Sequence, residues 1–146
     1  MKAKISLLTI FALLLFAQVA NATSFFADTR ATAYAMSMDG YYIGKIDSHL
    51  DADWFTYKNN TAVSKVVEIG LQSPPGTSVN YDFDLEYCTS SGACTSMTPF
   101  DYGAGQADYI LSLNLPPGYY VYWKVRGHSD QDYSSTYNYH TSIHGY

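Results

Sequence analysis

The chain has 146 residues, 13 acidic against 8 basic, and a formal net charge of −5 at pH 7. This acidic balance argues against a nucleic-acid-binding protein and against one that binds anionic membrane surfaces. The length fits one domain with a hydrophobic core of its own.

The first 22 residues have the features of a secretion signal. Lys2 and Lys4 supply a positive start, residues 5–20 are almost all apolar, and Ala20-Asn21-Ala22 fits the small-residue cleavage pattern. The apolar run is too short for a membrane-spanning helix, and no later stretch is apolar enough. We therefore predict a mature domain of residues 23–146, with net charge −7 after both lysines are removed. It would be secreted, to an extracellular or periplasmic compartment.

After Gly40 the chain alternates short strand-like segments with turns rich in Gly, Pro, Ser and Asp. A period of two between apolar and polar residues predicts half-buried strands, at residues 41–46, 53–58, 65–72, 80–88, 107–115, 119–126 and 135–143. Only residues 29–38 have a weak helical pattern. Many short strands with regular turns predict an all-β fold, an antiparallel, jelly-roll-like β-sandwich in a single domain.

The same period predicts which side chains face the core. The inward sets are Phe55 and Tyr57; Val67, Ile69 and Leu71; Tyr81, Phe83, Leu85 and Tyr87; Tyr109, Leu111, Leu113 and Leu115; and Tyr119, Val121, Trp123 and Val125.

Cys88 and Cys94 flank five small or turn-forming residues. In an oxidising compartment this spacing favours a disulfide across a hairpin tip. The alternative, a metal pair, lacks a further nearby cysteine or a histidine at zinc-site spacing.

The order of several motifs is similar to that of a known family. "DTRATAYAMSMDGYYIGKID" precedes "DADWFTYK", and "VVEIGLQSPPGTSVNYDFDLEY" and "LPPGYYVYWKVRG" follow. Across residues 28–143 the chain resembles the bacterial pre-peptidase C-terminal domain, a β-sandwich module appended to many secreted proteases and related to clostridial collagen-binding domains. The resemblance implies a sandwich without catalytic activity and a role in adhesion, export or substrate targeting.

The segment 119–126 carries the candidate binding surface. If Trp123 and its inward neighbours face the core, a row of two tyrosines and two cations faces outward, namely Tyr120, Tyr122, Lys124 and Arg126. Tyr and Arg are enriched in binding surfaces, and Tyr137 and Tyr139 would extend the row from a neighbouring strand. Alternatively, the tyrosines serve only cross-strand pairing on an ordinary sheet face.

Asp51 and Asp53 raise the question of a second site. A catalytic pair needs one carboxyl kept protonated in a cleft, whereas we expect two aspartates spaced in this way before a strand to lie exposed at one rim. Calcium binding is an alternative, with Asp47 or Asp28 adding oxygens, but calcium takes six to eight ligands. The simplest interpretation is that these aspartates cap a turn at a solvated strand end.

A further acidic row, Asp82, Asp84 and Glu86, is predicted on a solvated sheet face, where it would attract a cation or a basic partner. The histidines are His49, His128, His140 and His144, and they match no zinc-protease signature. The chain has no serine-hydrolase elbow, dinucleotide-binding motif or phosphate-binding loop either.

We therefore expect no enzymatic activity and no cofactor, with calcium as the one metal considered. The predicted function is a secreted binding module for an extracellular polymer, either a protein such as collagen or a polysaccharide. The alternative is an accessory, chaperone or inhibitor protein for a separately encoded exported protease.

Overall fold

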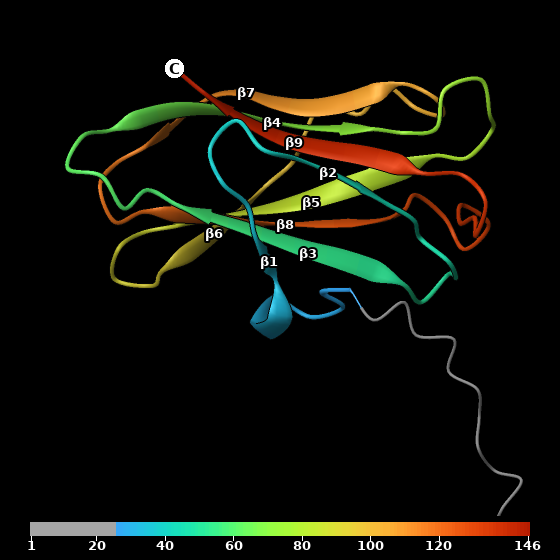
Figure 1. The fold of residues 1–146 in the computed structure, drawn as a ribbon, viewed down its shortest axis with the longest axis horizontal. Coiled ribbons are helices and arrows are strands. Elements are labelled where there is room, and N and C mark those ends of the chain that lie inside the picture. The colour runs from blue at the N-terminus through green and yellow to red at the C-terminus, as the bar shows by residue number, and fades with distance from the viewer. Residues whose placement is uncertain (1–25) are drawn as a thin grey trace, which may run out of the picture.

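The computed structural model describes residues 26–146. The predicted signal segment and its cleavage site lie outside these residues. The described chain is an all-β sandwich of two sheets, as predicted, with the two layers stacked face to face (Figure 1). No helix among the described residues is long and apolar enough to cross a membrane.

One sheet has five strands in the order β1-β3-β8-β5-β6. Their bounds are β1 Tyr34–Ala35, β3 Ala52–Lys58, β8 Tyr120–Gly127, β5 Tyr81–Cys88 and β6 Cys94–Met97. All neighbours are antiparallel except β1 and β3. The second sheet has the order β2-β9-β4-β7, with β2 Tyr41–Gly44, β9 Tyr139–Gly145, β4 Lys65–Gln72 and β7 Ala107–Leu115.

The core lies between the sheets and follows the predicted alternation in most strands. Trp123 on β8 is fully buried, stacks on Phe55 of β3 at 5.5 Å between ring centroids, and donates its indole N–H to Thr141 Oγ1 on β9 at 3.0 Å. This hydrogen bond joins the two sheets through the core, because β8 and β9 belong to different layers.

The predicted alternation is wrong in the first half of β7. Opposite β4, the pairing of Val67 with Leu113 is followed by that of Ile69 with Ile110, so β7 contains one extra residue. Such a bulge moves every side chain beyond it to the opposite face. Tyr109 and Leu111 therefore lie away from the core, whereas Ile110 and Asp108 are buried.

The structure also differs from the predicted elements near both ends of the described chain. Within residues 29–38 the chain forms a short 3-10 turn, Arg30–Thr32, capped by Thr29, and then the short strand β1. The last strand begins at Tyr139 rather than at residue 135, because Ser134 Oγ accepts the N–H groups of Thr136 and Tyr137 in a local turn.

Candidate functional site

The outward row of β8 lies where the sequence predicted it. Val121, Trp123 and Val125 are fully buried, and the residues between them, Tyr120, Tyr122, Lys124 and Arg126, are partly exposed on the outer face of the sheet. Tyr120 and Tyr122 meet edge to face at 5.7 Å.

The cations of this row are paired with the acidic row of β5. The register places Asp82 opposite Arg126 and Asp84 opposite Lys124. Lys124 Nζ lies 2.9 Å from Asp84, and Arg126 donates to both oxygens of Asp84 at 2.9 and 3.0 Å. These contacts hold the pKa of Asp84 below its ordinary value, although burial opposes them. The acidic row of β5, which was expected to attract a cation or a basic partner, is thus largely neutralised by side chains of the same sheet.

Cation–aromatic contacts complete the surface. The Arg30 guanidinium lies 4.5 Å from the centre of the Tyr122 ring and 2.8 Å from Glu86 Oε2. Lys124 Nζ lies 5.7 Å from the Trp54 ring centre. Such contacts hold the long side chains against the rings. We call this surface, formed by Arg30, Trp54, Tyr120, Tyr122 and Lys124, the aromatic face.

Two hollows lie on this sheet. One, of about 490 Å³, is lined by Tyr120 and Tyr122 together with Thr56, Lys58, Ser91 and Gly92. The other, of about 410 Å³, is lined by Trp54, Lys124 and Arg126 and reaches Asp82, Asp101 and Asp108. The predicted row therefore borders both hollows.

Tyr137 and Tyr139 do not extend this row. Tyr137 is exposed but lies in the loop before β9, and Tyr139 is fully buried. The prediction that Tyr139 lies on the surface is wrong, because β9 belongs to the opposite sheet and its odd-numbered residues Tyr139, Thr141 and Ile143 face the core.

Tyr139 instead reaches a buried carboxylate. Its hydroxyl donates to Asp53 Oδ2, and the other Asp53 oxygen has no hydrogen-bond partner among the described residues. Asp53 is 1% exposed, so the expectation of a solvated strand end is wrong for it. Burial raises the pKa of Asp53 to about 7; the Tyr139 hydrogen bond opposes this, and the charges of Asp51, Asp28 and Asp47 add to it. The pKa of Tyr139 is raised by burial and by Asp53.

Asp28, Asp51 and Asp53 bring carboxylate oxygens within 4.8 Å of one another. Hard oxygen donors fit calcium, but three carboxylates leave much of its usual shell of six to eight oxygens to other donors. Asp47, also predicted as a ligand, is not part of this carboxylate group; its backbone N–H donates to Asp51 Oδ2 at 2.7 Å. Burial raises the pKa of Asp51, and this hydrogen bond opposes the effect.

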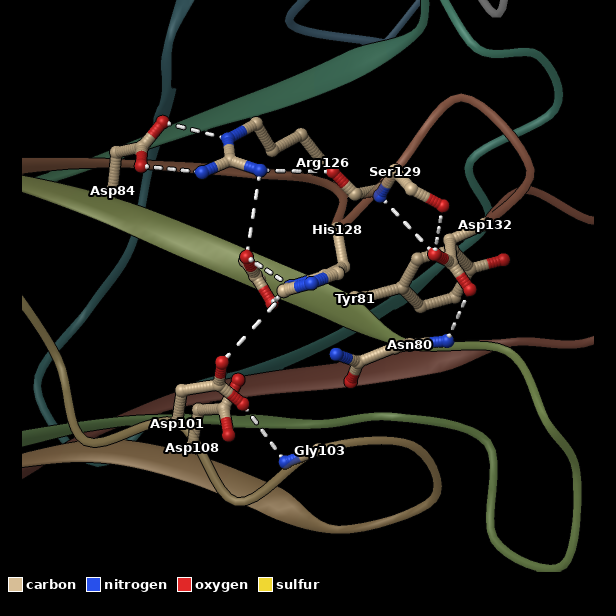
Figure 2. A network of polar contacts seen from close by, with 12 residues as sticks. Asn80, Tyr81, Asp84, Asp101, Gly103, Asp108, Arg126, His128, Ser129 and Asp132 are labelled. Atoms are coloured by element: carbon tan, nitrogen blue, oxygen red, sulfur yellow. Dashed lines mark hydrogen bonds and ion pairs between the residues drawn. The ribbon is translucent and has the colours of Figure 1, made fainter.

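A second polar cluster, which was not predicted from the sequence, lies where β5 begins and β8 ends. His128 Nδ1 contacts Asp82 Oδ2 at 3.0 Å and Asp101 Oδ2 at 4.0 Å. Figure 2 shows Asp101 and Asp108 below His128, and Arg126 turned toward Asp84; both aspartates line the 410 Å³ hollow. The hydrogen bond and charge of Asp82 raise the pKa of His128. Burial raises the pKa of Asp108 to about 6, opposed by a hydrogen bond from the Tyr102 N–H.

The predicted disulfide is confirmed. Cys88 and Cys94 are bonded across the hairpin between β5 and β6. Within the tip, the Thr89 N–H donates to Ala93 O at 2.8 Å, and Gly92 adopts a φ of +94°, a conformation that glycine tolerates best. The bond therefore links β5 to β6, the edge strand of the five-stranded sheet.

The sequence matches no protein-family model and no curated protein sequence. The structure is similar to the crystal structure of the pre-peptidase C-terminal domain of collagenase from Bacillus anthracis, with a TM-score of 0.53 and 16% sequence identity. The match covers 76% of this chain and 93% of that domain. The resemblance that the motifs predicted is thereby confirmed at the level of the fold.

Proposed function

We propose that the protein is a secreted, non-catalytic module that binds an extracellular polymer through the aromatic face. The observation that carries the proposal is the outward row of β8, whose tyrosines and cations border two hollows on one sheet. The likeness to a domain of a collagenase supports a non-catalytic module and makes collagen the first polymer to test. The disulfide fits an oxidising compartment.

The shape of the face favours an extended ligand. From Tyr120 to Arg126 the strand advances six residues, about 20 Å at the usual rise per residue. Tyrosine rings supply apolar area with few rotatable bonds, and their hydroxyls hydrogen-bond to a polar polymer. The ring contacts of Arg30 and Lys124 keep these side chains in place before the ligand arrives, which lowers the entropy lost on binding.

Co-sedimentation of the purified protein with insoluble collagen, chitin and cellulose tests this function. We expect saturable retention on one polymer and little on the others. A protein that binds none of the three, but inhibits or stabilises an exported protease in a separate assay, would contradict the proposal and support the accessory role.

A further inference from the structure

Three side chains from separate parts of the chain converge beside the 410 Å³ hollow: Asp82 and Asp101 line it, and His128 contacts both of them. Asp82 comes from β5, Asp101 from the segment between β6 and β7, and His128 from the loop after β8. Each offers one atom to a group in which all atoms lie within 4.8 Å of one another. His128 Nδ1 is 3.0 and 3.2 Å from the two oxygens of Asp82.

These spacings resemble those between ligands of one metal ion. Bonds of about 2.1 Å at a tetrahedral angle place neighbouring ligand atoms about 3.4 Å apart. The distance from His128 Nδ1 to Asp101 Oδ2, 4.0 Å, has to shorten by about 0.6 Å to reach this spacing. Both side chains are about half exposed, so each has room to make that movement.

The backbone positions two of the ligands. The His128 N–H donates to Asn80 O at 3.0 Å, and Asp132 accepts both the Asn80 N–H, at 2.9 Å, and the Ser129 N–H, at 3.1 Å. The Gly103 N–H donates to Asp101 Oδ1 at 2.8 Å and leaves Oδ2 directed toward His128. Hydrogen bonds of this kind orient ligands in known metal sites.

Asp108 gives an independent indication of a cation. Its side chain is 3% exposed and lines the same hollow as Asp82 and Asp101. Within residues 26–146 the Tyr102 N–H donates to Asp108 Oδ1 at 2.8 Å. Asp108 Oδ2 is not among the enclosed atoms that lack a partner, so it is open to the hollow and available to a cation there. A buried carboxylate is stable when it is paired with a cation or bound to a metal.

We propose that Asp82, Asp101 and His128 bind one divalent transition-metal ion of the zinc type, with Asp108 as the buried carboxylate behind them. One imidazole nitrogen with carboxylate oxygens suits zinc and its neighbours, whereas calcium takes oxygen ligands alone.

The nearby Arg126 does not occupy the site. Its guanidinium is directed to Asp84 through two hydrogen bonds of 2.9 and 3.0 Å, and its contact with Asp82 Oδ2 is the longer one, at 3.5 Å. The three carboxylates of Asp82, Asp101 and Asp108 leave the local charge negative after Arg126 is counted, which favours a dication.

Isothermal titration of the chelator-treated protein with zinc chloride tests the site. We expect one zinc ion per chain. His128→Ala and Asp101→Asn should each weaken zinc binding at least tenfold. Asp101→Asn keeps an oxygen that accepts the Gly103 N–H, so its effect reports the lost ligand charge rather than a lost turn. Melting curves of both variants without metal should match that of the wild type.

His144→Ala is the matched control. His144 is similarly exposed and lies 3.9 Å from Asp39, and within residues 26–146 it belongs to no cluster of three metal-ligating side chains. It should leave zinc affinity unchanged, and NMR should show zinc-dependent shifts of the His128 imidazole alone. Absence of zinc binding, binding that survives His128→Ala, binding lost in His144→Ala, or displacement by tenfold excess calcium would each overturn the proposal.

Discussion

Replacing Asp53 by Asn should remove a specific pH dependence from the stability of the fold. The carboxyl is buried, accepts one hydrogen bond from Tyr139 and has one oxygen without a partner. Its pKa rises from 3.8 in a model compound to about 7 in the folded protein. Asn keeps the shape and the acceptor for Tyr139 but does not titrate.

The sign and size of the effect follow from linkage. Because the folded state holds the Asp53 proton more tightly than the unfolded state, the contribution is fully present below pH 3.8 and is lost as the pH rises through about 7. At about 1.4 kcal/mol for each pH unit between the two pKa values, the whole contribution is about 4 kcal/mol. Between pH 5 and pH 8 about 2.5 kcal/mol of it should disappear.

Urea denaturation of wild type and Asp53→Asn at pH 5, 6, 7 and 8, in the presence of chelator, measures this directly. Other titrating groups are shared by both proteins and largely cancel in the difference. The difference in free energy of unfolding should move by about 2.5 kcal/mol in favour of the variant as the pH rises from 5 to 8. Tyr139→Phe should displace the wild-type transition to higher pH, because the hydrogen bond from Tyr139 lowers the pKa of Asp53.

Parallel curves of unfolding free energy against pH for the two proteins would contradict this prediction. They would mean that Asp53 is solvated in solution and that its contact with Tyr139 does not persist.

Three further outcomes test the fold and its bonds. Trp123→Ala should cost about 3–5 kcal/mol of stability in urea denaturation, whereas Tyr122→Ala should cost at most about 1 kcal/mol, the value of its contact with Arg30; the reverse order would show an inverted register. Replacing both Cys88 and Cys94 by Ser should cost about 2 kcal/mol for so short a loop, and two reactive thiols in the unreduced, denatured wild type would disprove the bond. Chelator and millimolar calcium should change the melting temperature by only a few degrees, and a large rise with calcium would show that calcium binding supports the fold.

Local alternation was sufficient to predict most of the sandwich. In β4, β5 and β8 the apolar period of two placed most of the buried side chains correctly. β5 and β8 pair regularly with each other, β8 pairs regularly with β3, and β4 pairs regularly with β9; opposite β7, the extra residue lies in β7 and not in β4. Asp53 shares the parity of Phe55 and Tyr57, so its inward direction was also present in the pattern.

The features that the sequence did not predict depend on contacts between distant segments of the chain. The bulge in β7 reverses the direction of Asp108, and no residue type in that segment signals the bulge. Tyr139 has the alternation of a strand, but the sequence does not show which sheet that strand joins. The contact of Asp82, Asp101 and His128 depends on three distant segments meeting, so no sequence spacing predicts it.

Polymer binding by the aromatic face is measured by comparing Tyr122→Ala with Tyr41→Ala in binding isotherms on the polymer that retains the wild type. Tyr41 is a more exposed tyrosine on the opposite sheet. If the aromatic face binds the polymer, Tyr122→Ala weakens binding by about 1 kcal/mol or more, and Tyr41→Ala leaves it unchanged. Equal binding by both variants, or loss with Tyr41→Ala alone, would contradict it.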